Sequence, residues 1–107
     1  MGDRRIVLLK FPDEYGADLV VYTHWGGSEA MNDVLAIVSS SDFTSRIGDA
    51  SYAARIFVDQ FTMSARDEPA GFGVFPLVRG KDPTQFAENE YGNIITVDVM
   101  TGAITHG

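Results

Sequence analysis

Six consecutive residues, Tyr22 to Gly27, hold most of the side chains in this sequence that are suited to molecular recognition. The imidazole of His24 can donate or accept a hydrogen bond, and the indole of Trp25 offers a flat apolar face with one N–H donor. Such a pair is typical of a recognition pocket. A structural alternative stays open, in which Trp25 fills the core between a sheet and a helix and His24 bonds to the backbone. Gly26 and Gly27 predict a tight turn from a strand into a helix.

A second polar group, formed by Arg46, Asp49, Tyr52 and Arg55, stands near the start of an expected helix. Helix capping and salt bridging are one explanation of it. The other is that Arg46 or Arg55 pairs with an anionic ligand or with a partner's carboxylate. Tyr52 and Arg55 lie one helical turn apart, and Arg55 is expected to approach the first group. The candidate ligand- or partner-binding residues are therefore Tyr22, His24, Trp25, Arg46, Tyr52 and Arg55.

Three segments carry a resemblance: Tyr22–Gly27, Asp49–Arg55 and Gly71–Val74. They are similar to a group of small uncharacterised proteins from bacteria, archaea and their phages. That group has a Tyr-x-His-Trp-Gly/Asp-Gly element early and a Tyr-Ala-x-Arg element in a later helix, and the resemblance spans most of the chain. It implies a source and a fold unit, and a single cluster of the two tyrosines with His24, Trp25 and Arg55. It implies no activity.

Several chemistries are disfavoured by the sequence. The two histidines, His24 and His106, stand far apart without the spacing of metal ligands, and there is no cysteine. No segment has the pattern of a nucleophile elbow or of a phosphate-binding loop. We therefore expect no catalytic residue, no cofactor and no metal ion. A non-catalytic role is favoured, and an enzymatic role stays open as the alternative.

The acidic residues are concentrated in the middle of the chain, whose formal net charge is −7. Residues 28–70 carry seven acidic and three basic side chains, residues 1–27 carry four and three, and residues 71–107 carry four and two. No cluster of lysine and arginine could neutralise several phosphates, so direct nucleic-acid binding is not expected. An acidic surface suits solubility or a basic partner instead. No apolar run approaches the ~20 residues of a membrane span, so we expect no membrane contact. The lack of cysteine fits the cytoplasm.

Apolar periodicity predicts the element order strand, strand, helix, helix, strand, strand, strand. The strands are expected at residues 5–11, 17–23, 71–78, 94–100 and 103–105, the last two joined by a two-residue turn. The helices are expected at 29–38 and 50–62, and residues 42–47 could form one more short helical turn between them. This order predicts an α+β fold: an antiparallel sheet of about five strands with both helices on one face. The 107 residues should form one domain. Its expected core contains Leu8, Val20, Leu35, Ile56, Phe57 and Val97.

Two classes of function fit these observations. The first is a small acidic non-catalytic binding protein, such as a phage or mobile-element accessory factor that acts on a host protein. The second is a ligand-binding or enzymatic domain with a pocket at His24, Trp25 and Arg55. A nucleic-acid mimic is a weaker alternative, because the acidic residues are scattered. A deep pocket beside His24 would favour the second class, and a flat apolar or acidic patch the first.

Assembly can also be predicted from the strand pattern. The strand around Val74, or the one at residues 103–105, should lie at an edge of the sheet. Because edge strands expose unpaired backbone groups, we expect a homodimer.

Overall fold

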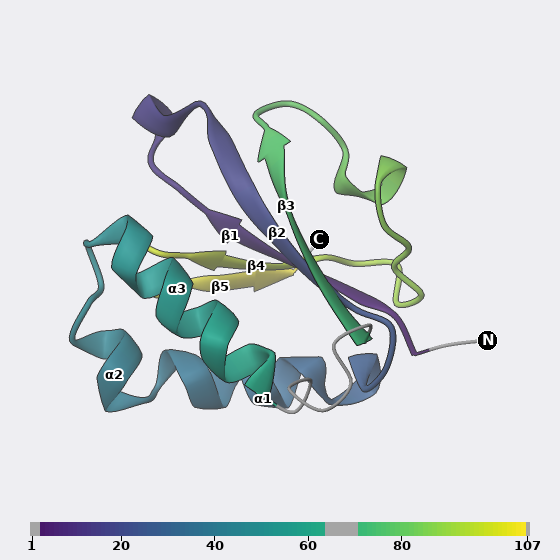
Figure 1. Ribbon diagram of the computed structural model, residues 1–107, viewed down its shortest axis with the longest axis horizontal. Helices are drawn as coiled ribbons and strands as arrows, with labels where there is room; N and C mark the ends of the chain where they lie inside the picture. Colours follow the sequence, from purple (N-terminus) through teal and green to yellow (C-terminus); the bar gives the residue numbers. More distant parts are fainter. Residues whose placement is uncertain (1–2, 64–70, 107) are drawn as a thin grey trace.

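The computed structural model describes residues 3–63 and 71–106. Its elements are β1 (Arg5–Lys10), η1 (Asp13–Tyr15), β2 (Ala17–Thr23), η2 (Gly27–Glu29), α1 (Ala30–Val38), α2 (Ser41–Thr44), α3 (Ala50–Phe61), β3 (Phe72–Val78), η5 (Pro83–Gln85), β4 (Ile95–Asp98) and β5 (Ile104–His106), where η marks a single 3₁₀ turn. Over the described ranges the five strands form one sheet in the order β3-β2-β1-β4-β5. The three α-helices lie together on one face of this sheet (Figure 1). The α+β class is thus confirmed.

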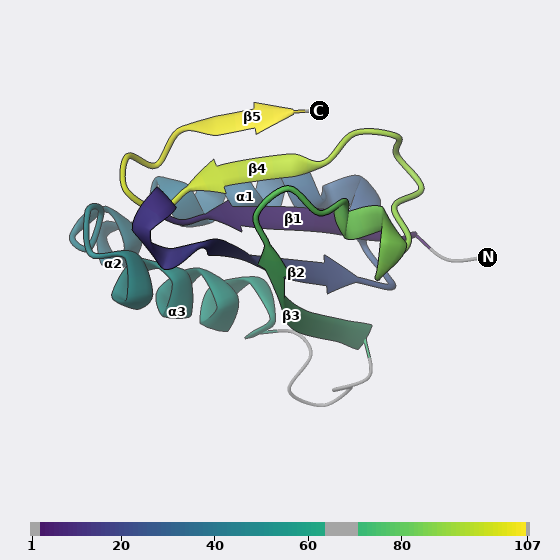
Figure 2. The same ribbon diagram turned by 90° about the horizontal axis from the view of Figure 1, so that it is seen from above.

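The predicted all-antiparallel sheet is wrong at one strand pair. β1–β2, β2–β3 and β4–β5 are antiparallel, but β1 and β4 are parallel, with Val7 opposite Ile95. The cause is the long connection from β3 to β4, residues 79–94, which crosses the sheet and lets β4 enter beside β1 in the same direction (Figure 2). The short helical turn considered for residues 42–47 is a separate helix, α2, so the described residues form three α-helices instead of two.

The sheet is apolar on both faces, because successive side chains of its central strands point to opposite sides. On the helix side, β1 and β2 contribute Val7, Leu9 and Val21 to the larger core. The other face carries a smaller cluster of Ile6, Val20 and Leu77. Residues of the 79–94 segment, including Ala87 and Ile94, pack against that cluster. The β3–β4 connection therefore serves as a cover for the face that has no helix.

The prediction of a single core is wrong because each face of the sheet has its own apolar cluster. Phe57 and Val97 lie in the helix-side core and Ile56 packs against it, whereas Val20 and Leu8 belong to the opposite face. Leu35 is 49% exposed. The spacing of apolar residues in α1 fits two overlapping stripes, one with Leu35 and one without it. The buried stripe is the one without Leu35, and it consists of Ala30, Val34 and Ile37.

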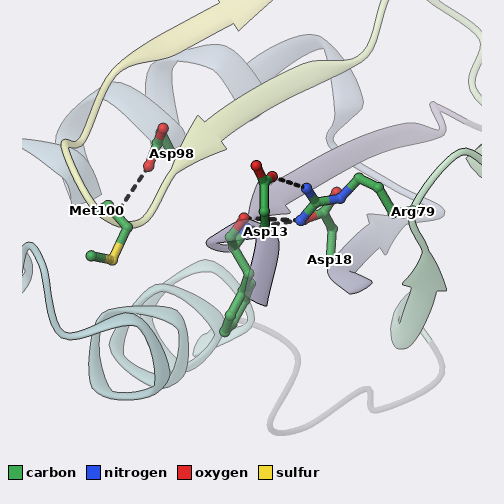
Figure 3. Close-up of polar contacts among 6 residues, drawn as sticks. Asp13, Asp18, Arg79, Asp98 and Met100 are labelled. Carbon is green, nitrogen blue, oxygen red and sulfur yellow. Dashed lines mark hydrogen bonds and ion pairs between the residues drawn. The ribbon is translucent and has the colours of Figure 1, made fainter. Parts of the chain in front are cut away.

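The turn between β4 and β5 is longer than the predicted two residues. Asp98 and Ala103 are joined by a backbone hydrogen bond of 2.9 Å, which leaves four residues, Val99 to Gly102, in the turn. The Asp98 carboxylate accepts a hydrogen bond of 2.8 Å from the backbone N–H of Met100 (Figure 3). This local side-chain bond ends β4 early, because it offers the backbone an alternative to the strand ladder.

Arg79 fastens the end of β3 to the turn between β1 and β2 (Figure 3). Its guanidinium donates to Asp13 at 2.5 Å, to Asp18 at 2.8 Å and to the carbonyl of Phe11 at 3.0 Å. The hydrogen bond to Asp13, followed by the charge of Asp18, raises the pKa of Arg79. Asp18 is only 8% exposed, and the same carboxylate oxygen also accepts from the N–H of Phe11 at 2.9 Å. These three bonds of Arg79 are called here the clamp. The clamp compensates the buried charge of Asp18 and holds the outer strand β3 in place.

Candidate functional site

Tyr22 and His24 lie side by side on the sheet face that has no helix. Their ring centroids are 5.6 Å apart in an edge-to-face arrangement. They line a small hollow of about 210 Å³ together with Arg4, Phe86, Ala87 and Glu88. Arg4 donates to Glu88 at 2.7 Å and to Glu90 at 3.3 Å, so its charge is already paired. The hollow therefore offers an imidazole and aromatic edges, with little net positive charge for an anion.

Arg46 and Tyr52 meet at the corner between α2 and α3. The guanidinium carbon of Arg46 stands 5.1 Å from the centroid of the Tyr52 ring, a cation–π distance. Arg46 also pairs with Asp49 at 3.6 Å, and both of these side chains are about half exposed. The Arg46–Asp49 pair agrees with the structural explanation of this group, in which salt bridging supports the helix start.

Trp25 and Arg55 are both exposed. Trp25 lies two residues after the end of β2 and is 62% exposed, so it does not fill the core as the structural alternative required. The side of α3 that faces the sheet carries Ala53, Ala54 and Phe57, so the exposed Arg55 points away from the sheet. The cation–π pairs in the described part of the chain involve Arg5 and Arg46, not Arg55 with Trp25.

The expected single cluster is therefore wrong. Tyr22 and His24 do share one face of β2, as strand alternation predicts, but that face is opposite to α3. Arg55 and Tyr52 consequently lie on the far side of the sheet from His24. Alternation along one strand tells which residues share a side, whereas the choice of the helix-bearing side depends on the whole topology.

The turn after β2 depends on both glycines, as predicted. Gly26 has φ +74°, in the left-handed region that glycine adopts without strain. Gly27 lies against the N-terminal segment: its N–H donates to the Asp3 carbonyl at 2.8 Å. A Cβ on Gly27 would stand 2.5 Å from that carbonyl oxygen and 3.0 Å from the Cβ of Arg5. Close packing, not backbone freedom, thus requires glycine at position 27.

A Gly27→Ala substitution should cost about 1–3 kcal/mol of unfolding free energy, as for other substitutions that overfill a packed site. The matched control is Gly26→Asn, because nothing lies within 4 Å of a Cβ at Gly26 and asparagine tolerates left-handed backbone. Urea denaturation measures both changes. Equal losses for the two variants would contradict the steric explanation.

A hollow larger than the one beside His24 lies between α1, α2 and α3. It is an open groove of about 710 Å³, called here the acidic groove, and its lining residues are Asp33, Ala36, Ile37, Asp42, Asp59, Gln60, Phe61 and Met63. Apolar side chains form part of the surface and three carboxylates stand around them. None of these lining residues is a lysine or an arginine.

One carboxylate of the acidic groove, that of Asp33, lies in an environment unfavourable to its charge. Partial burial, and then the neighbouring charge of Glu29, raise the pKa of Asp33 above its usual 3.8. Asp42 accepts a hydrogen bond of 3.4 Å from the side chain of Gln60, which is a neutral donor. A cation brought into the groove would relieve the crowding of negative charge around Asp33.

An Asp33→Asn substitution should raise the unfolding free energy at pH 7 by up to about 0.5 kcal/mol, because it removes a like-charge i, i+4 pair with Glu29. Since the folded pKa of Asp33 is raised, its ionised form destabilises the fold above that pKa. The gain in unfolding free energy should therefore disappear as the pH falls to 3.8, the ordinary pKa that the Asp33 carboxyl has in the unfolded chain. Denaturation at pH 7 and at pH 3.5 checks this sign, and a variant less stable than the parent at pH 7 would refute it.

The acidic groove was not among the residues predicted from the sequence. The one signal that pointed toward it is the excess of acidic residues between positions 28 and 70. That excess does not by itself indicate a site. The site forms because the packing of α1, α2 and α3 brings Asp33, Asp42 and Asp59 to the same apolar side chains. Across residues 3–63 and 71–106, no group of three histidine, cysteine or carboxylate residues is arranged to hold a metal ion. No helix in these ranges has the length and hydropathy needed to cross a membrane.

Comparison of the chain with protein-family models, with curated proteins and with solved structures gives no match.

Proposed function

We propose that this chain is a small acidic, non-catalytic protein-binding domain that receives a basic, partly apolar segment of another protein in the acidic groove. The observation that carries the proposal is the composition of the groove, in which Ile37, Phe61 and Met63 stand beside Asp33 and Asp42. Such a surface is complementary to a segment with lysine or arginine next to apolar residues. The resemblance to phage and prokaryotic proteins leads us to propose a host protein as the partner, bound in the cytoplasm.

The sizes of the two hollows support this choice. Ligand sites usually measure about 300–1,000 Å³, and the acidic groove, at about 710 Å³, lies within that range. The hollow beside His24 measures about 210 Å³ and lies below it. The groove is also partly open to solvent, which suits a chain segment better than an enclosed small molecule.

The charge of Asp33 gives a second reason. Its raised pKa means that the folded protein holds this charge at a cost. Natural sequences tolerate such local costs at functional surfaces, where the unfavourable group serves binding. A bound lysine or arginine would lower the cost, because an opposite charge stabilises the ionised carboxylate.

The test uses a synthetic amphipathic helical peptide with lysines on one face and leucines on the other, and a second peptide with glutamate in place of lysine. Titration should show binding of the lysine peptide only, with a dissociation constant that rises with salt. The double variant Asp33→Asn/Asp42→Asn should weaken binding roughly 2- to 30-fold, since each exposed ion pair contributes about 0.2–1 kcal/mol.

The matched control is Glu14→Lys, which makes the same change of net charge at an exposed residue outside both hollows. It should leave the dissociation constant nearly unchanged. An equal loss in the groove double variant and in this control would mean that only net charge attracts the peptide, and the proposal would fail.

The second candidate function is a small ligand site at His24. It is favoured by one observation, that the imidazole and the ring of Tyr22 both line a hollow. Arg55, which was to complete that site, lies on the other side of the sheet. A His24→Ala substitution that abolished binding of a partner or ligand, while Asp33→Asn did not, would favour this candidate.

A further inference from the structure

The outer side of β3 is a free sheet edge in the described part of the chain. β3 pairs along its length with β2, from Ala17 opposite Val78 to Thr23 opposite Phe72. Just beyond the ends of this pairing, the N–H of His24 donates to the Gly71 carbonyl and the N–H of Arg79 donates to the Gly16 carbonyl. Because hydrogen-bonded pairs alternate along an antiparallel ladder, the odd-numbered residues of β3 direct their backbone groups toward β2. The even-numbered residues direct theirs outward.

The outward backbone groups belong to Phe72, Val74, Pro76 and Val78. Proline has no N–H, so this edge presents three outward donors and four outward carbonyls. Pro76 thus sits where its missing donor costs the sheet nothing, as is usual for proline in an edge strand. The expectation that β3 is an edge strand is confirmed.

The same edge is apolar and carries no charge over its seven residues. Val74 and Val78 are 47% and 62% exposed, although charged residues usually protect such edges from pairing. The apolar surface continues on both sides of the strand. Tyr15 borders a hollow of about 180 Å³ lined mainly by apolar groups, and Phe86, 61% exposed, packs on Phe75 at 5.7 Å between ring centroids.

We propose that a second copy of this chain pairs with this edge, β3 against β3 in antiparallel orientation, about a two-fold axis at Phe75. In this register Phe72 faces the partner's Val78, and Val74 faces the partner's Pro76. Each of the three outward N–H groups then finds a carbonyl of the partner strand. Pro76 needs only to accept, which is all that it can do.

Neighbouring registers satisfy fewer groups. An axis at Val74 places Val78 beyond the partner's β3, and an axis at Pro76 sets two prolines opposite each other with no donor between them. With the axis at Phe75, the Phe75 rings of both copies face each other and Gly73 faces the partner's Leu77. The hydrogen-bonding pattern and the side-chain sizes therefore both favour a self-complementary pairing.

Charge and area also point to a second copy as the occupant. A chain with a net charge of −7 repels itself over most of its surface, but no carboxylate stands between Phe72 and Val78. A stable interface buries about 1,200–2,000 Å² in total, more than one strand edge supplies. The exposed side chains of Tyr15, Val74, Val78 and Phe86 extend the apolar area on both faces. We expect a dissociation constant on the order of micromolar.

The lack of cysteine makes the register directly testable. Phe75→Cys places a thiol at the axis, in a non-hydrogen-bonded pair whose Cα atoms lie about 4.5 Å apart, which suits a disulfide. Mild oxidation should link this variant into dimers. Val74→Cys should stay unlinked, because its counterpart lies two residues along the partner strand, beyond the ~7 Å limit for bridging. Linkage of Val74→Cys but not of Phe75→Cys would overturn the register.

Sedimentation equilibrium of the unmodified chain tests the dimer itself. Val74→Lys puts a charge on the edge and should weaken association at least tenfold. Leu35→Lys is the matched control, since it makes the same change of charge at a similarly exposed apolar residue on α1. A single monomeric mass for the unmodified chain at millimolar concentration would overturn the proposal. So would association that is lost in Leu35→Lys and kept in Val74→Lys.

Discussion

A Phe57→Ala substitution is expected to lower the unfolding free energy by about 3–5 kcal/mol. Phe57 is fully buried, and its ring centroid lies 5.5 Å from that of Phe61 and 6.4 Å from that of Phe43. It therefore joins α2 and the end of α3 to the helix-side core. Because domains of this size have only about 5–15 kcal/mol of stability, the loss would remove a large fraction of it.

Denaturant melts of Phe57→Ala and of Leu35→Ala measure this expectation. Leu35 is an apolar residue on a neighbouring helix, but it is 49% exposed, so its truncation should change the free energy by less than about 0.5 kcal/mol. A loss below about 1 kcal/mol for Phe57→Ala would show that this ring is not part of a close-packed core.

The sequence predicted most elements of the fold, because local patterns determine where strands and helices form. The five strands and the two longer helices occur where alternation and helical periodicity placed them. The parallel pairing of β1 with β4 was not predictable from the same patterns. It depends on the path of residues 79–94 across the sheet, and a loop of that length carries no periodic signal of its direction.

The candidate site was predicted less well than the fold. Alternation placed Tyr22 and His24 on one side of β2, and helical spacing put Tyr52 and Arg55 one turn apart. Neither pattern tells which face of the sheet the helices cover. The prediction therefore placed the two pairs in one cluster, although they lie on opposite sides of the sheet. The acidic groove shows the reverse case. Asp33 and Asp42 are unremarkable in sequence and become neighbours of common apolar residues only through the packing of three helices.

The second large effect is expected at the clamp between Asp18 and Arg79, and it should be asymmetric. Arg79→Met leaves the Asp18 carboxylate, 8% exposed, with the N–H of Phe11 as its remaining donor. A carboxylate left in a buried site without its cation costs about 3–5 kcal/mol. Asp18→Asn should cost less, because the remaining guanidinium is about one-third exposed and keeps its hydrogen bonds to Asp13 and to the Phe11 carbonyl.

The double variant Arg79→Met/Asp18→Asn separates this explanation from a simple loss of contacts. Asp18→Asn should destabilise the parent protein but stabilise the Arg79→Met variant, since there it removes a buried charge that nothing compensates. Urea melts at pH 7 of the parent, the two single variants and the double variant measure both changes. If Asp18→Asn destabilises both backgrounds equally, Arg79 acts by tethering β3 through Asp13 and Phe11, and its compensation of the buried carboxylate contributes little.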